Sequence, residues 1–218
     1  LLQAGLADAA VCGGIGDWWR HMSYAMPIIP KQPGVSRIYG LSVLILQTGA
    51  LFICDTHMNT DPSAAEIAEM TGLAAATVRS FGIVPKAALL SHSSFGSSRS
   101  PSARKMRDAL ALVRAQQPGL EVDGEMHADA ALVEAVRDRA VPDSKLSGTA
   151  NLLIMPTLDA ANIAFTLLAA AADGLSIGPL LLGASKPLHV LVPSVTARGI
   201  LNVSAVLAME ANARLNLA

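Results

Sequence analysis

The chain has little of several features that would place it in a specialised class. Only 2 of its 218 residues are cysteines, Cys12 and Cys54, and their spacing is not that of a metal site or a disulfide framework. The formal net charge is −1 with no run of like charges, which argues against nucleic acid or a membrane surface as a partner. Although 52% of the residues are hydrophobic, no apolar stretch reaches the roughly 18 residues of a membrane-spanning helix. We therefore expect a cytoplasmic protein with free, buried thiols.

The common catalytic and nucleotide-binding motifs are also missing. The sequence contains no Gly-x-Gly-x-x-Gly, no phosphate-binding Walker loop and no Gly-x-Ser-x-Gly elbow. No motif therefore supports a dinucleotide-binding or hydrolase function. The first residues lack an initiator methionine and the basic segment of a signal peptide. This abrupt start predicts that the chain is a fragment of a longer polypeptide.

What the chain does contain is an alternation of short apolar runs with helical patterns. This order is typical of an α/β domain with a largely parallel, doubly wound sheet. A tight turn at Thr48-Gly49 predicts a hairpin, and the spacing of Ser63 and Glu66 predicts a capping box at a helix start. Strands are predicted at 9–12, 41–46, 50–55, 86–90, 121–123, 151–155 and 189–191, and helices from Ser63, at 102–116, 128–139 and 161–172, and from about Ser194.

A serine-rich turn at 91–98 follows one of these predicted strands and precedes a helix. Ligands in open α/β sheets collect at the carboxyl ends of the strands, where backbone N–H groups and a helix N-terminus attract anions. Ser91, Ser93, Ser94 and Ser97 offer hydroxyls, and Gly96 frees the backbone. The turn therefore predicts a site for a phosphate-bearing ligand, although taken alone it fits a polar surface loop equally well.

Two further junctions carry polar residues. Asp123 and Glu125 lie close to a histidine, which suggests a metal site, but acidic residues at a helix start are also explained by capping and the helix dipole. We favour capping and loop orientation. Asp159 at the third junction fits an ordinary N-cap, and Asn162, one helical turn later, would face the same cleft.

Taken together, four stretches resemble the phosphate acetyltransferase and butyryltransferase family. They are residues 89–97, 123–126, 150–163 and 177–187, and their order and spacing agree over nearly the whole chain. The resemblance implies a two-lobed, three-layer α/β/α fold with a mostly parallel sheet, like that of isocitrate and isopropylmalate dehydrogenases. Residues 1–34 and 186–218 would form lobe I, incomplete at its N-terminal side, and residues 35–185 would form lobe II. The implied ligands are a CoA ester and phosphate, held by Ser91, Ser93, Ser94, Gly96, Ser97, Asp123, Glu125, Asp159 and Asn162.

The chain departs from this family where the chemistry is expected. Active transferases of the family carry a Ser-Arg pair and, a few residues later, an aspartate base. This chain has Val192, Pro193 and Gly199 at those positions, and none of these side chains can supply a positive charge or accept a proton. We therefore predict ligand binding without acyl transfer, and we assign neither a catalytic residue nor a metal site.

Three strings resemble one subgroup, the C-terminal domain of bacterial NADP-dependent malic enzymes: residues 55–59 with 61–64 after them, 151–156 and 193–196. This resemblance implies acetyl-CoA as a regulatory effector and a homo-oligomer, dimeric or larger. It also implies a malic enzyme module in the same polypeptide, which would hold NADP and a divalent metal and decarboxylate malate to pyruvate, with no cofactor in this fragment. The alternatives are an active phosphate acetyl/butyryltransferase and a purely structural oligomerisation domain.

Overall fold

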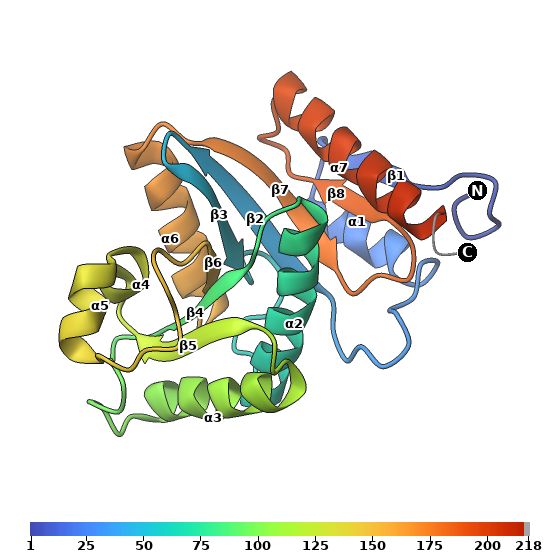
Figure 1. Ribbon diagram of the computed structural model, residues 1–218. Helices are drawn as coiled ribbons and strands as arrows, with labels where there is room; N and C mark the ends of the chain where they lie inside the picture. Colours follow the sequence, from blue (N-terminus) through green and yellow to red (C-terminus); the bar gives the residue numbers. More distant parts are fainter. Residues whose placement is uncertain (216–218) are drawn as a thin grey trace.

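In the computed structural model, which describes residues 1–215, the strands form two separate sheets (Figure 1). One has six strands in the order β5-β4-β6-β3-β2-β7, and the other pairs β1 with β8. The strands are β1 (Ala10–Gly13), β2 (Tyr39–Leu46), β3 (Gly49–Cys54), β4 (Lys86–Leu90), β5 (Glu121–Met126), β6 (Leu152–Ile154), β7 (Leu175–Leu182) and β8 (Leu188–Leu191). The helices are α1 (Trp18–Ala25), α2 (Ala64–Ser80), α3 (Pro101–Gln116), α4 (Ala128–Leu132), α5 (Glu134–Ala140), α6 (Leu158–Ala171) and α7 (Ala197–Leu215).

The six-stranded sheet is mixed, which corrects the prediction of a mostly parallel sheet. β3, β6, β4 and β5 are parallel to one another, whereas β2 runs antiparallel to both of its neighbours, β3 and β7. The reason is the short connection between β2 and β3, since a tight hairpin can only join antiparallel strands. The carboxyl ends of the four parallel strands still meet at one edge of the sheet, and the turns that follow them lie there.

Helices cover both faces of the six-stranded sheet and make three layers (Figure 1). Leu152 and Ile154 of β6 point into the cluster formed with α2 and α3. Leu153, between them, points to the opposite face and packs in a second cluster with α4 and α6. Consequently α2 and α6 lie on opposite faces of the same sheet.

The remaining elements form a smaller unit around the two-stranded sheet. β1 and β8 are parallel, and Trp18 and Met22 of α1 are buried against them in a third hydrophobic cluster. The indole Nε1 of Trp18 donates a hydrogen bond to the carbonyl of Val190 in β8 (2.9 Å). Val203 and Leu207 of α7 pack in the same cluster as α2, so the smaller unit joins the core of the larger one. The lobe boundaries at residues 34 and 186 remain a prediction.

Strong local signals are confirmed. Ser63 caps α2, and the full capping box with Glu66 is present. β4 spans the predicted residues, and Cys54 is buried as a free thiol, while Cys12 is only half-buried. None of the described helices is both long and apolar enough to cross a membrane.

Several predicted details are wrong. The helix predicted at 128–139 is two short helices that meet at Val133, which has extended backbone angles. Thr157, not Asp159, is the N-cap of α6, because its side chain accepts the N–H of Ala160. The apolar spacing of Ile200, Val203 and Leu207 predicts one buried face of the last helix, but Ile200 is 42% exposed. α1 and β7 were not predicted at all.

Candidate functional site

The serine-rich turn after β4 is held in place by one buried carboxylate, that of Glu125 in β5. Its Oε1 accepts hydrogen bonds from the Ser93 hydroxyl (2.7 Å), the Gly96 N–H (3.0 Å) and Arg107 Nη1 of α3 (2.9 Å). The Glu125 side chain is fully buried, whereas that of Arg107 is 32% exposed. Two predicted ligand residues, Ser93 and Gly96, are thus hydrogen-bonded to a third, Glu125, within the fold.

The serine hydroxyls of the turn also bond to one another and to nearby backbone. Ser93 Oγ lies 3.1 Å from Ser97 Oγ and accepts the N–H of Ser98 (3.0 Å). Ser97 Oγ accepts the N–H of Ser94, whose own hydroxyl accepts the N–H of His127. The turn therefore keeps a fixed shape without a ligand. Gly96 and Ser97 are exposed at its outer surface.

Asp123 has a comparable anchoring position further back on β5. Its Oδ1 accepts from Arg114 Nη2 (2.8 Å), and its Oδ2 accepts from Ser144 Oγ (2.8 Å) and the N–H of Lys145 (2.7 Å). This carboxylate anchors the segment after α5 and makes no hydrogen bond to the serines of the turn at 91–98. Among residues 1–215 no cluster of three or more metal-ligating side chains occurs. The contacts of Asp123 and Glu125 agree with the predicted orienting role, but the predicted capping is wrong, because the N-cap residue of α4 is His127 and no side chain caps it.

The third predicted junction borders a small cavity. Asp159 is exposed in the first turn of α6, and Asn162 Nδ2 donates to the carbonyl of Thr56 (3.2 Å). Both line a hollow of about 270 Å³ together with Trp19 and His57. Asp159 and Asn162 are thus brought together, but none of the predicted serines lines this hollow.

Next to this hollow lies a larger cavity of about 560 Å³, which we call the main cleft. It separates α6 and β7 from the segment 192–199 that leads into α7, and Asn162 lines it as well. Its polar lining consists of hydroxyls, one amide and one imidazole: Ser42, His57, Asn162, Thr166, Ser176, Ser194 and Thr196. None of these side chains carries a formal charge at neutral pH, because burial lowers the pKa of His57 from 6.5 to about 4.

The main cleft contains two of the three positions at which the chain departs from the transferase pattern. Val192 and Gly199 both line it. His57 is its one titratable lining group, and His57 Nδ1 lies 2.9 Å from Thr56 Oγ1. With a pKa of about 4 this imidazole is a weak base, so the cleft offers shape and hydrogen bonding but little acid-base capacity.

Sequence reasoning missed most of the main cleft. Of the nine predicted ligand residues, only Asn162 lines it. His57 follows β3 at the carboxyl-terminal edge of the sheet, and this position is the signal that could have identified it. Ser42 and Ser176 lie within strands, where nothing in the local sequence marks them as cavity residues.

Comparison with known proteins shows which family this chain resembles. The family model described as phosphate acetyl/butaryl transferase matches residues 1–208. The NADP-dependent malic enzyme of Escherichia coli (strain K12) is 49% identical over 97% of this chain, and the NAD-dependent malic enzyme of Rhizobium meliloti (strain 1021) is 51% identical over 97%. These matches cover 28% and 27% of the two enzymes, so the chain spans just over a quarter of their length.

Among solved structures, a phosphotransacetylase from Streptococcus pyogenes superposes with a TM-score of 0.92 and 33% identity. This match covers 97% of the chain and 65% of that protein. The identity to malic enzymes is thus clearly higher than the identity to this phosphotransacetylase. What the chain matches in the malic enzymes is their C-terminal, phosphotransacetylase-like region.

Proposed function

This chain belongs to the phosphate acetyl/butaryl transferase family, and we propose that it is the regulatory C-terminal domain of a bacterial malic enzyme. In this proposal the main cleft binds a CoA ester such as acetyl-CoA and does not transfer its acyl group. Malate is oxidatively decarboxylated, with NADP and a divalent metal, in a separate module of the same cytoplasmic polypeptide. The proposed fold class is the two-lobed one of isocitrate and isopropylmalate dehydrogenases.

The observation that carries this proposal is the identity of two residues in the main cleft. Val192 and Gly199 line a cavity of about 560 Å³, where a transferase needs a hydrogen-bonding group and a proton acceptor. Loss of a positioned base or a fixed charge costs a catalyst about two to four orders of magnitude in rate. The hydroxyls and the Asn162 amide nonetheless suit the amide and thioester groups of a CoA ester, which are neutral hydrogen-bonding partners.

Calorimetry and a turnover assay test this proposal together. We expect acetyl-CoA to bind the chain at up to about 1 mM, and we expect no CoA-dependent release of phosphate from acetyl phosphate. Ala169→Phe, which puts a ring into the main cleft, should weaken acetyl-CoA binding by about tenfold or more. Ala135→Phe on the exposed side of α5 is the matched control and should bind normally.

Each alternative function has its own signature in these experiments. Substantial turnover of acetyl phosphate would show an active transferase and overturn the interpretation of Val192 and Gly199. Absence of acetyl-CoA binding, combined with a stable oligomer, would leave only the structural oligomerisation role. Any ligand that binds the folded state alone must also raise the thermal stability, which gives an independent readout.

We further propose that α6 forms the contact between two copies of the chain. Ala161 is the only fully buried residue of this helix, whereas Ile163 and Leu167, one turn apart, are 63% and 65% exposed. From Ala160 to Ala171 the helix carries no charged side chain. A two-fold contact places the same residues against each other, and an uncharged apolar face meets this condition without repulsion.

Light scattering coupled to size exclusion tests the α6 contact. The native chain should elute as a dimer or a larger assembly, and Leu167→Glu should convert it to monomers. Leu201→Glu, on the exposed side of α7 at 68% exposure, is the matched control and should keep the native mass. A monomeric native chain, or an unchanged mass of Leu167→Glu, would refute this part of the proposal.

A further inference from the structure

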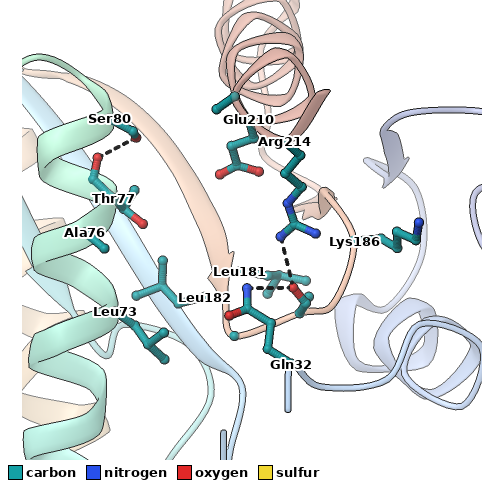
Figure 2. Close-up of a pocket in the computed structure, with 13 residues that line it drawn as sticks. Gln32, Leu73, Ala76, Thr77, Ser80, Leu181, Leu182, Lys186, Glu210 and Arg214 are labelled. Carbon is teal, nitrogen blue, oxygen red and sulfur yellow. Dashed lines mark hydrogen bonds between the residues drawn. The ribbon is translucent and has the colours of Figure 1, made fainter. Parts of the chain in front are cut away.

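A further cavity lies between α2 and α7, on the other side of the six-stranded sheet from α6 (Figure 2). Its volume is about 280 Å³, and we call it the α2–α7 cavity. One wall is formed by α2, with Leu73, Ala76, Thr77 and Ser80. The other wall is the end of α7, with Glu210, Ala213 and Arg214. Residues 181–184 and Gln32 form the floor. It shares no lining residue with the main cleft. A volume of this size suits a ligand smaller than a CoA ester.

The α7 wall holds a carboxylate and a guanidinium that do not pair with each other. Glu210 and Arg214 are spaced i, i+4 on the helix, in the order that normally favours an ion pair. Arg214 instead donates to the carbonyls of Ser185 and Ala184 in the connection to β8. Those two bonds use two of its five N–H groups, so the remaining ones can bind a ligand. Figure 2 shows Glu210 across the cavity from Thr77 and Ser80, and Arg214 extending toward Gln32 at the floor.

Glu210 has only a weak protein partner. His189 Nε2 lies 3.4 Å from Glu210 Oε1, beyond a good hydrogen bond, and this nitrogen is buried without another partner. His189 Nδ1 accepts the N–H of Leu181 (3.0 Å), which fixes the neutral tautomer with its proton on Nε2, facing Glu210. The carboxylate is 22% exposed, so it combines partial desolvation with open acceptor capacity. Such a group can accept a hydrogen bond from a ligand that enters the cavity.

We propose that the α2–α7 cavity binds a free α-amino acid with an aliphatic side chain. The ammonium group of the ligand binds Glu210, with Thr77 on the facing wall, and the carboxylate binds the free N–H groups of Arg214. The aliphatic side chain packs on Leu73 and Leu182. The charges of the wall explain this choice of ligand class. A pure anion is repelled by Glu210 and a pure cation by Arg214, whereas a zwitterion satisfies both. Lys186, the other charged lining residue, points away from the cavity in Figure 2.

Calorimetry and thermal shift with L-leucine test the proposal on the full chain. L-leucine should bind at up to about 10 mM, whereas N-acetyl-leucine and leucinamide, each lacking one charge, should bind about tenfold more weakly or worse. Glu210→Gln should weaken L-leucine binding by about tenfold, and Ala76→Phe, which fills the cavity from the exposed side of α2, should abolish it. Asp108→Asn on α3 removes the same charge elsewhere and is the matched control.

Acetyl-CoA binding, measured on the same variants, separates this site from the main cleft. It should be unchanged in Glu210→Gln and Ala76→Phe, and unaltered binding there also shows that both variants are folded. Absence of L-leucine binding to the native chain would overturn the proposal. So would equal binding of L-leucine and N-acetyl-leucine, or equal binding to the native chain and to Ala76→Phe.

Discussion

Replacing Glu125 by glutamine should destabilise the chain by about 2 kcal/mol. The substitution keeps the shape of the side chain and an oxygen that can still accept from Ser93 or Gly96. It removes the charge that faces Arg107 at 2.9 Å. A hydrogen bond between charged groups contributes about 1.5–3 kcal/mol, and the partial exposure of Arg107 places the expected loss in the lower half of that range. For a chain of this size, this corresponds to a fall in Tm of about 4–8 °C.

Urea unfolding followed by circular dichroism measures this loss as a shift in the midpoint at constant slope. Asp61→Asn is the matched control, because Asp61 also pairs with a cation, Lys105, but its side chain is 74% exposed. Removing this surface pair should cost about 0.5 kcal/mol or less. A double-mutant cycle with Arg107→Met should return a coupling of about 1 kcal/mol or more. If Glu125→Gln costs no more than Asp61→Asn, the carboxylate does not anchor the serine-rich turn.

Three other perturbations test the fold and the main cleft. The pKa of His57 is lowered by burial from 6.5 to about 4 in the folded chain, so stability present above pH 6.5 should be lost as the pH falls toward 4. This loss amounts to about 2–3 kcal/mol, and urea midpoints of His57→Gln across that pH range should lack it. Phe52→Ala should cost about 3–5 kcal/mol in urea unfolding, because the ring is fully buried with its centroid 5.5 Å from that of Phe81. Ser63→Ala removes the capping box with Glu66 and should lower the free energy of unfolding by about 1 kcal/mol; a change below about 0.3 kcal/mol would contradict the capping role.

Elements whose residues decide their structure locally could be predicted from the sequence. β4 is a short apolar run between turn residues, and its bounds are those of the prediction. The start of α2 is set by Ser63 and Glu66, which need no distant partner. The hairpin of β2 and β3 was predicted as well, but its consequence for sheet direction was not, since strand order depends on contacts between distant segments.

The two missed elements have weaker local signals, although Asp17 does cap the start of α1 by accepting the N–H groups of Trp19 and Arg20. β7 contains Gly178-Pro179, which is typical of a turn, and a proline in a strand is tolerated here because β7 lies at the edge of the sheet. α1 has eight residues, too few for a helical periodicity to stand out. Its place is decided instead by the bond from Trp18 to Val190, 172 positions away.

The position of the serine-rich turn could be predicted from the sequence, whereas the main cleft could not. The serine-rich turn lies where parallel strands end, as its sequence indicated. That Glu125 would serve as its internal anchor depends on a contact with Arg107 of α3, which no local pattern shows. The main cleft was missed because its polar residues come from two strands, α6 and the segment before α7, and His57 by itself resembles any packed histidine.

β7 contributes to both cavities. Its first half, with Ser176 and Gly178, lines the main cleft, and its last residues, Leu181 and Leu182, form the floor of the α2–α7 cavity. One strand therefore borders both spaces. Thermodynamic reciprocity then sets a strict rule: if an occupant of one cavity changes affinity at the other by some factor, the second ligand changes affinity for the first by the same factor. Titrating each ligand in the absence and presence of the other would measure this factor twice, and the two values must agree.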